Sequence, residues 1–280
     1  MHAERPPVLA NPRSDRVKKL AALGGRSVRM RQGRFLIEGP QSVREAIRFI
    51  PQGLHVYVQD DHPSAAVADI VASCPAPSLS YATAAVMRAI SPDCQGIAAV
   101  APLDFATHYR LTGDDDAAHL RSLIGDTNLL MCLPHISDPG NAGTLIRIAD
   151  AAGAGGVLLG RGSVEVTNPK VVRSAAGSLF HLPVITGLEP LRAIDLLREA
   201  GYTTIGADGY AHQDVTDIDL SGPVAWVFGH EAHGLGEEGR RACDVLAKIP
   251  LLGHAESLNV AAAAAVCMYA RQLRGIHGGV

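Results

Sequence analysis

Apolar and polar positions in the first hundred residues follow two periods, one typical of amphipathic helices and one typical of strands. Apolar side chains three or four residues apart indicate helices, and short apolar runs closed by glycine or proline indicate strands. The predicted elements, in chain order, are a helix within 11–23 capped by Ser14, a strand and a helix within 35–50 with a turn at Gly39 and Pro40, a strand at 55–60, a helix at 65–72, a strand at 78–81, a helix at 84–89 and a strand at 96–102. Strands that alternate with helices predict a small three-layer α/β domain at 1–103.

The pattern changes over 104–127, where polar and acidic residues prevail and no strand alternation is sustained. We interpret this segment as a linker with at most one helical turn. Beyond it the predicted elements are a strand at 128–134, a helix at 141–153, a strand at 156–160, a helix and a strand within 168–185, a helix at 191–201, strands at 203–207 and 224–229, and an alanine-rich helix that begins close to Ser257. This alternation predicts a second α/β domain at 128–280, built on a parallel sheet with helices on both faces.

Two glycine-marked loops in the second domain follow predicted strands. The segment 226–235 reads WVFGHEAHGL, and the segment 249–259 reads IPLLGHAESLN. We expect each to be a strand that runs into a loop at its carboxyl end, where open α/β sheets bind ligands. We group a third segment, 135–159, with these two loops. Because the loops combine glycines with few polar side chains, we expect the ligand to be held partly by main-chain groups.

Charge is distributed unevenly, which changes the picture given by the net charge of −3. Residues 1–50 carry eleven Lys and Arg against four Asp and Glu, a formal charge of +7, whereas the rest of the chain carries 14 against 24, a formal charge of −10. This asymmetry favours phosphate contacts at the N-terminal end. The candidate RNA-binding residues are Arg16, Lys18, Lys19, Arg26, Arg29, Arg31 and Arg34. The alternative interpretation is that these basic side chains form an ordinary solvated surface.

Several classes of protein and site are not indicated. No apolar run approaches the roughly 20 residues of a membrane-spanning helix, and Glu4 and Arg5 stand where a signal peptide needs an apolar core. We therefore expect a cytoplasmic protein with no membrane partner. The five cysteines form no CxxC pair and are expected to be free thiols. HEAH at 230–233 lacks the HExxH spacing of a zinc helix, so no metal is expected. GAGG at 153–156 follows a helix rather than a strand, which argues against a dinucleotide loop.

Four motifs together carry a specific resemblance. They are NAGTLIR (141–147), NPKVVRSAAGSLFHLPV (168–184), FGHEAHGL (228–235) and IPLLGHAESLNVAAAAAV (249–266). In this order they resemble the SpoU, or TrmH-like, family of SPOUT RNA 2′-O-ribose methyltransferases, and within it the ribosomal RNA and thiostrepton-resistance-like subgroup. The resemblance implies a trefoil-knotted catalytic domain, an obligate homodimer, S-adenosyl-L-methionine as cofactor and methylation of a ribose 2′-hydroxyl. FLIEGPQSVREAI (35–47) is similar to the ribosomal-protein-like RNA-binding domain that many members carry.

The resemblance also implies the site residues. Catalytic roles fall to Asn141, Arg147, Glu231, Ser257 and Asn259, and cofactor contacts fall to Ala207, Asp208, Phe228, Gly229, Glu231, Gly234, Ile249, Leu251, Ser257, Leu258 and Asn259. Residue chemistry alone offers structural alternatives for three of them. Glu231 can order its loop through main-chain amides, Ser257 can cap the last helix, and Asn259 can bind backbone.

The family assigns the proton step at the ribose hydroxyl to the arginine that matches Arg147. A guanidinium stays protonated near neutrality and is therefore a poor base. We favour Arg147 as a cation that binds the target phosphate and stabilises a developing alkoxide. A role as base and a role as simple surface charge remain the alternatives.

Two histidines depart from the family pattern. His230 stands where asparagine is commoner, and His233 precedes Gly234. We expect altered loop packing rather than lost activity. The expected function is S-adenosylmethionine-dependent 2′-O-methylation of structured RNA, with ribosomal RNA as the first candidate. The alternatives are a transfer RNA 2′-O-methyltransferase and a non-catalytic RNA-binding or ribosome-assembly factor on the same scaffold.

Overall fold

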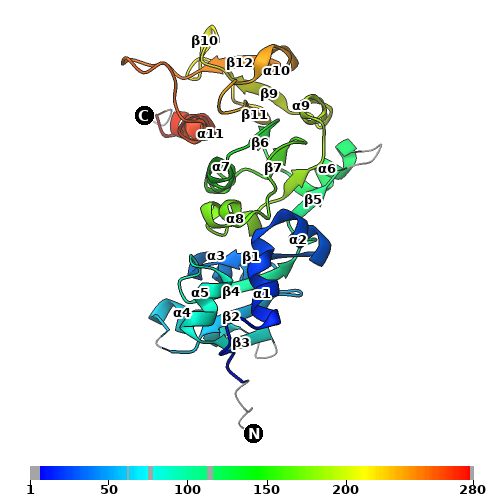
Figure 1. Cartoon of the computed structure of the whole chain (residues 1–280). Helices are drawn as coiled ribbons and strands as arrows, with labels where there is room; N and C mark the ends of the chain where they lie inside the picture. Colours follow the sequence, from blue (N-terminus) through cyan, green and yellow to red (C-terminus); the bar gives the residue numbers. More distant parts are fainter. Residues whose placement is uncertain (1–6, 62, 75–77, 112–115, 278–280) are drawn as a thin grey trace. The chain divides into compact units, whose positions relative to one another are not determined.

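The chain forms two compact units in a computed structural model that describes residues 7–61, 63–74, 78–111 and 116–277 (Figure 1). The first unit comprises Met1–Ala106 together with Val166–Phe180, and the second comprises Thr107–Glu165 together with His181–Val280. Each unit has its own sheet and its own apolar core.

The first unit is built on a four-stranded sheet of order β1-β4-β2-β3. Its strands are β1 (Arg34–Glu38), β2 (His55–Gln59), β3 (Leu79–Ala82) and β4 (Ile97–Pro102), and its helices include α1 (Asp15–Ala21), α3 (Pro40–Phe49), α4 (Ala65–Ser73) and α5 (Ala84–Ile90). The β2–β3 pair is parallel, and β4 runs antiparallel to both β1 and β2. Helices α1 and α5 pack on one face, over Leu36, Tyr57 and Val100. All the strands and helices predicted for this domain are confirmed, including the Ser14 cap, whose Oγ accepts a hydrogen bond from the Val17 amide.

The arginine-rich stretch after Gly25 forms a helix that was not predicted, α2 (Arg26–Gln32). It ends at Gly33, whose φ of 63° is the left-handed conformation that glycine adopts readily. On its inner face Arg29 is only 2% exposed and donates hydrogen bonds from Nη1 to the carbonyl oxygens of Leu23 (3.1 Å) and Gly24 (2.8 Å). Arg29 therefore fastens α2 to the preceding turn, and the prediction that it contacts RNA is wrong.

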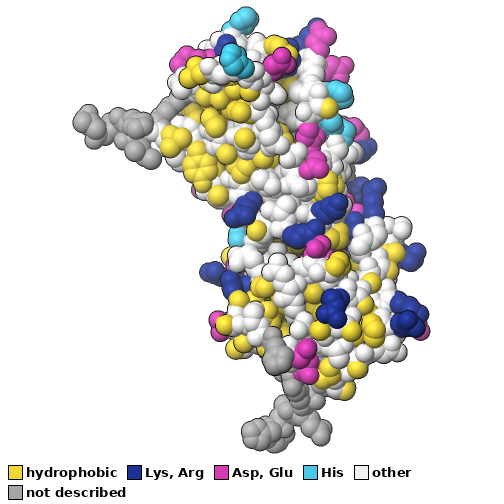
Figure 2. All heavy atoms as spheres, turned by 60° about the vertical axis from the view of Figure 1, so that its left-hand side comes forward, with side chains coloured by type: hydrophobic (Ala, Val, Ile, Leu, Met, Phe, Trp, Pro, Cys, Tyr) yellow, Lys and Arg dark blue, Asp and Glu magenta, His cyan; other side chains and the backbone are white. Residues whose placement is uncertain are grey.

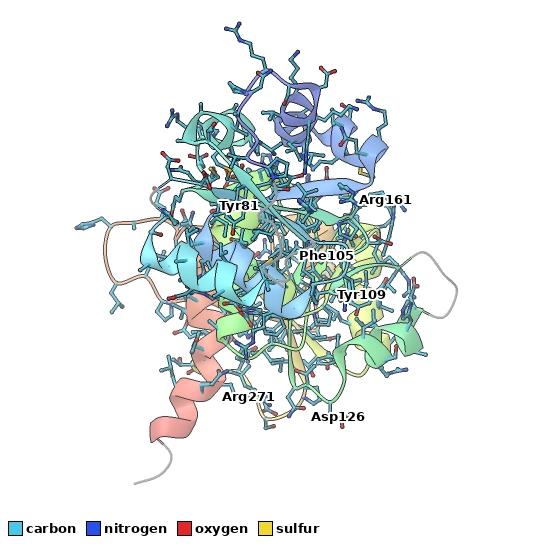
Figure 3. The ribbon with its side chains drawn as sticks, turned by 90° about the horizontal axis from the view of Figure 1, so that it is seen from below. Tyr81, Phe105, Tyr109, Asp126, Arg161 and Arg271 are labelled. Carbon is cyan, nitrogen blue, oxygen red and sulfur yellow. The ribbon has the colours of Figure 1, made fainter. Side chains whose placement is uncertain are left out.

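The segment 166–180 groups with the first unit rather than with the second, where we expected it. It contains α8 (Pro169–Ala175) and the 3₁₀ turn η3 (Ser178–Phe180). Arg173 of α8 pairs with Glu38 at the end of β1 (3.0 Å) and with Asp93. The ring of Phe105, labelled in Figure 3, lies 5.2 Å from that of Phe35 and 5.8 Å from that of Phe180. These long-range contacts leave no local pattern in the sequence.

The second unit is built on an eight-stranded sheet of order β10-β12-β9-β11-β6-β7-β8-β5. Its strands are β5 (His108–Arg110), β6 (Leu129–Leu133), β7 (Val157–Leu159), β8 (Val184–Thr186), β9 (Thr203–Ala207), β10 (Gln213–Asp214), β11 (Val224–Phe228) and β12 (Val245–Lys248). Every pair in it is parallel, which confirms the predicted sheet type. The central strands β6 and β11 are buried along their whole length.

Helices cover both faces of this sheet. They are α6 (Asp116–Ile124), α7 (Pro139–Ala151), α9 (Pro190–Glu199), α10 (Gly236–Ala242) and α11 (Val260–His277). Figure 1 shows α7 and α11 on one side and α9 on the other. Leu120 of α6 and Ile194 of α9 share one core with Leu130 and Leu158 of the sheet.

Helix α11 is bound to its surroundings near its C-terminal end. The hydroxyl of Tyr269 donates to the carbonyl oxygen of Ala151 (2.7 Å) at the end of α7. Arg271, labelled in Figure 3, donates to the carbonyl oxygens of Ser221 and Gly222, both at 2.6 Å. These bonds fix the helix whose other end carries the site residue Asn259.

Three predictions about the second domain need correction. The segment 104–127 is not a linker, because β5 pairs with β8 and Leu111, Leu120 and Ile124 lie in the core. The strand expected from Ile249 lies earlier, at β12. The last helix begins at Val260 and not at Ser257.

The remaining structural expectations concern thiols and membrane spans. All five cysteines are free, as expected, and Cys94, Cys132 and Cys267 are buried. Across the described residues, no helix combines the length and the apolar character needed to span a bilayer.

Candidate functional site

The carboxyl ends of three neighbouring strands lie side by side in the second unit. Strand pairing sets Phe228 of β11 opposite Ala207 of β9, and Ala207 opposite Ala247 of β12. On its other side β11 pairs with β6, where Val227 is opposite Cys132. The loops after these strands therefore leave the sheet at one edge, and the segment that leads into α7 joins them there. This is the edge at which the two glycine-marked loops were expected.

The loop after β11 is closed tightly by its own main chain. The amides of His230 and Gly234 each donate to the other residue's carbonyl oxygen, both at 2.8 Å. A Cβ on Gly229 would lie 2.0 Å from the Gly234 carbonyl carbon, so a larger residue at 229 cannot be accommodated. Gly234 has a φ of 62°, a conformation that favours glycine. Two of the predicted cofactor-site glycines are thus required by the loop itself.

Glu231 connects this loop to the start of α7. Its Oε1 accepts a hydrogen bond from the Asp138 amide at 3.0 Å, and 20% of its side chain is exposed. Burial raises the pKa of Glu231, but hydrogen bonds from the amides of Asp138, Glu231 and Ser137 and from the Asn141 side chain outweigh it and hold the pKa below the usual range. The expectation that Glu231 orders its loop through main-chain amides is confirmed.

Asn141 joins the same network from the first turn of α7. Its amide donates to Oδ1 of Asp138 (2.7 Å), which caps the helix ahead of Pro139. Its side-chain oxygen accepts a hydrogen bond from Asn259 Nδ2 at 3.4 Å. Asn259 in turn accepts from the Ala261 amide (2.8 Å), so Asn259 binds backbone as expected and takes the capping role considered for Ser257.

The structure thus brings together three of the five predicted catalytic residues, Asn141, Glu231 and Asn259. Ser257 lies exposed two residues before Asn259. Arg147 is exposed on α7, and its direction from the helix axis differs from that of Asn141 by about 120°, because six residues at 3.6 per turn give that rotation. Arg147 therefore lies on a different side of α7 from Asn141.

The loop after β12 has the features of a ligand-binding segment. Within the described residues, no amide of 249–258 donates to another backbone group. Leu251 and Leu258 expose 39% and 41% of their surface. Available main-chain groups beside exposed apolar side chains fit a ligand with a flat apolar ring and polar substituents, such as the adenosyl group of S-adenosylmethionine.

The other predicted cofactor residues stand at the adjoining strand ends. Ala207 and Ile249 are partly buried, whereas the Phe228 side chain is buried against Trp226, so Phe228 can offer only its backbone. Asp208 is engaged within its own turn, since its carboxylate accepts from the Tyr210 amide (2.8 Å) and pairs with Arg240 (3.0 Å). Asp208 therefore forms the turn, and its contact with a cofactor stays a prediction.

Sequence reasoning missed Ser137 and Asp138, which hold Glu231 in place. A signal for them exists, because Asp-Pro commonly opens a helix and Asp138-Pro139 does so here. The predicted helix began two residues too late, at Asn141.

In the first unit, the predicted RNA-binding residues other than Arg29 are exposed, namely Arg16, Lys18, Lys19, Arg26, Arg31 and Arg34. Among the described residues no group of three or more His, Cys, Asp or Glu could hold a metal ion.

The geometry and the motifs agree with a sequence match over the second half of the chain. Residues 128–269, just over half of the 280, match the family model described as the SpoU rRNA Methylase family. The chain belongs to this family. The membership predicted from the motifs is therefore confirmed.

Curated relatives have names that agree with this membership. A 23S rRNA (guanosine-2′-O-)-methyltransferase RlmB from Bordetella pertussis is 38% identical over 149 residues, which cover 52% of this chain and 61% of that protein. A 23S rRNA (uridine(2479)-2′-O)-methyltransferase from Streptomyces viridochromogenes is 38% identical over 147 residues, which cover 51% of each. The chain thus spans less than two thirds of the length of these relatives.

Solved structures resemble the whole chain. A crystal structure of an RNA 2′-O ribose methyltransferase has a TM-score of 0.79 and 26% identity, and the match covers 96% of this chain and 100% of that one. The SpoU methyltransferase AviRb from Streptomyces viridochromogenes, in complex with the cofactor AdoMet, has a TM-score of 0.75 and 27% identity, with 94% and 99% covered.

Proposed function

We propose that this protein transfers a methyl group from S-adenosyl-L-methionine to the 2′-hydroxyl of a ribose in structured RNA, with ribosomal RNA as the substrate. The observation that carries the proposal is the hydrogen-bonded network of Asn141, Glu231 and Asn259 at the shared edge of the parallel sheet. Three family motifs supply these residues. The names of the relatives, which specify 23S rRNA 2′-O-methylation, support the choice of substrate.

The chemistry requires alignment of a hydroxyl with a methyl donor and help with loss of the hydroxyl proton. S-adenosylmethionine, when bound, supplies an activated methyl group on its sulfonium. The main chain of 249–258 and of the loop 229–236 would hold it, with Leu251 and Leu258 against the adenine. Glu231 fixes the geometry between its loop and α7. Arg147 would bind the phosphate of the target nucleotide and stabilise the alkoxide as the hydroxyl proton passes to solvent water.

The proposal includes a homodimer with active sites shared between subunits. Arg147 is exposed on a different side of α7 from Asn141, and we propose that it serves the site of a partner subunit. Hydrophobic side chains gather on the part of the second unit seen in Figure 2, and Val266 and Leu273 of α11 expose 40% and 51% of their surface. An apolar helical face of this kind suits a self-complementary interface. The trefoil knot implied by the resemblance would be formed by the loops that hold the cofactor.

RNA recognition would rest on the first unit, for which we propose the ribosomal-protein-like role. Six exposed basic side chains on α1, on α2 and at the start of β1 offer contacts to phosphate groups. Such contacts give affinity that falls steeply with salt concentration. Since the proposed substrate is ribosomal RNA, we assign the enzyme to the cytoplasm.

The test is methyl transfer in vitro with the full chain. Large-subunit ribosomal RNA and transfer RNA, each from cells lacking the gene, are incubated with labelled S-adenosylmethionine, and the modified ribose is located by its resistance to alkaline cleavage. We expect label in ribosomal RNA alone. Label in transfer RNA alone would favour the other substrate, and binding of RNA without transfer would favour a non-catalytic factor.

A further inference from the structure

Three histidine rings form a row at the edge of the sheet that carries the site. His135 follows β6, and His230 and His233 belong to the loop after β11. The ring centroids of His135 and His230 are 5.0 Å apart at an interplanar angle of 59°. Those of His230 and His233 are 5.2 Å apart at 18°, which is an offset stack. The two outer rings belong to residues that are exposed.

The middle ring is fixed by hydrogen bonds. His230 Nδ1 accepts from the Ala232 amide at 3.1 Å, so the proton of the neutral ring lies on Nε2. Nε2 then donates to Ser137 Oγ at 2.7 Å and lies 3.6 Å from a carboxylate oxygen of Glu231. Because the amide of Ser137 also donates to Glu231, the row is joined to the network that contains Asn141.

Neither a metal site nor a core contact accounts for this row. No set of three or more ligating side chains in the described residues, these histidines included, could hold a metal ion. The larger aromatic rings on the adjoining strand, Trp226 and Phe228, are buried. The imidazoles are therefore an aromatic surface that this edge of the sheet presents to a ligand, beside the Tyr210 ring after β9, which is 85% exposed.

We propose that His233, backed by His230 and His135, is a stacking platform for an unpaired nucleobase of the RNA substrate, next to the ribose that is methylated. This inference rests on the proposed function, because it requires the target ribose to lie at Asn141 and Glu231. Proteins that read unpaired RNA stack splayed bases on aromatic side chains, histidine among them. A platform of this kind accepts any base and positions the nucleotide without reading its sequence.

The test compares His233→Ala with His233→Phe, which removes the imidazole nitrogens and keeps a flat ring. The matched control is His119→Ala, an exposed histidine on α6. For each full-length variant we measure the dissociation constant of large-subunit ribosomal RNA from cells lacking the gene, by filter binding. S-adenosylmethionine affinity, by calorimetry, and the rate of methyl transfer are measured in parallel.

We expect His233→Ala to weaken RNA binding about ten-fold, the effect of losing one stacked base. His233→Phe and His119→Ala should stay within about two-fold of the parent, and cofactor affinity should be unchanged in all three. Unchanged RNA affinity in His233→Ala would overturn the platform, and so would a His233→Phe variant as weak as His233→Ala. Equal losses of RNA affinity and cofactor affinity in His233→Ala would also overturn the platform, because they would show that His233 supports the structure of the loop. Absence of methyl transfer by the parent would refute the proposed function instead, while the binding comparison would still decide on the platform.

Discussion

At the scale of single residues, the site depends on a carboxylate that serves as a hydrogen-bond acceptor. Glu231 gathers amides from Ser137 and Asp138 and the side chain of Asn141, and these bonds set the distance between two loops. Arg147, on the same helix as Asn141, is exposed at about 120° around the helix axis from it. We therefore assign the ordering of the loops to Glu231 and the chemical step to Arg147.

Substitution of Glu231 should change how stability depends on pH. The folded pKa of Glu231 lies below its ordinary value of 4.5, so the ionised carboxylate stabilises the protein above pH 4.5, and this stabilisation is lost as the pH falls through the folded pKa. Glu231→Gln removes the titration. Chemical denaturation at pH 7 and at pH 3 should show a larger loss of unfolding free energy in the parent than in the variant. An equal loss of unfolding free energy in the parent and in Glu231→Gln would mean that the amide contacts do not favour the charged form of Glu231.

Arg147→Ala should lower methyl transfer by about two to three orders of magnitude, the cost of losing a group that stabilises transition-state charge. Cofactor binding and most RNA affinity should remain, since transition-state contacts affect turnover more than ground-state binding. Arg147→Lys should recover only part of the rate, because an ammonium cannot reproduce the planar two-pronged contact with phosphate. Single-turnover kinetics with saturating RNA provide the measurement. A variant that turned over normally would leave Arg147 as a simple surface charge.

At the scale of elements, the loop after β11 is the least tolerant part of the site. Gly229→Ala would place a Cβ 2.0 Å from main-chain carbon, so the loop would have to open. Backbone strain of this kind costs on the order of 1–3 kcal/mol, and we expect cofactor affinity to fall at least ten-fold in calorimetry. Gly222→Ala is the control, because nothing lies within 4 Å of a Cβ at Gly222. If both variants bound the cofactor like the parent, the loop would not hold it.

Element prediction from the sequence succeeded where the apolar period was strong and failed where it was weak. The amphipathic helix α3 and the apolar strands β6 and β11 were predicted within two residues. Helix α2 was missed because arginines fill it, and β5 because it has only three residues. Helix α10 was missed because GEEGRRA has no apolar stripe. The burial of Arg29 depends on carbonyl oxygens of the preceding turn, which no pattern of charges reveals.

The meeting of Asn141, Glu231 and Asn259 could be predicted because the motifs identify residues that the strand order then gathers, whereas their catalytic and cofactor-binding roles stay predictions. Asn141 and Asn259 are distant in sequence yet hydrogen-bonded, which follows once parallel strands place their carboxyl ends together. The cap of α11 is a local bond from the Ala261 amide to Asn259, as the backbone-binding alternative for Asn259 had suggested. The grouping of 166–180 with the first unit depends on long-range packing and could not be predicted.

At the scale of the whole molecule, the proposed dimer makes a direct prediction. Mixing Arg147→Ala subunits with Asn259→Ala subunits should restore part of the methyl-transfer activity that each variant lacks alone. The reason is that one composite site in each heterodimer would be intact. Subunit exchange is checked first, with two affinity tags and native mass spectrometry. Heterodimers without any recovery would place each complete site within one chain.

The most direct test of the central claim is a map of 2′-O-methylated riboses in cells with and without the gene. Alkaline-resistance sequencing of total RNA should show one ribose in ribosomal RNA that is methylated in the parent and unmodified in the deletion strain. Methylation should return with the parent gene and stay absent with Arg147→Ala. An unchanged map in the deletion strain, or full restoration by Arg147→Ala, would contradict the account.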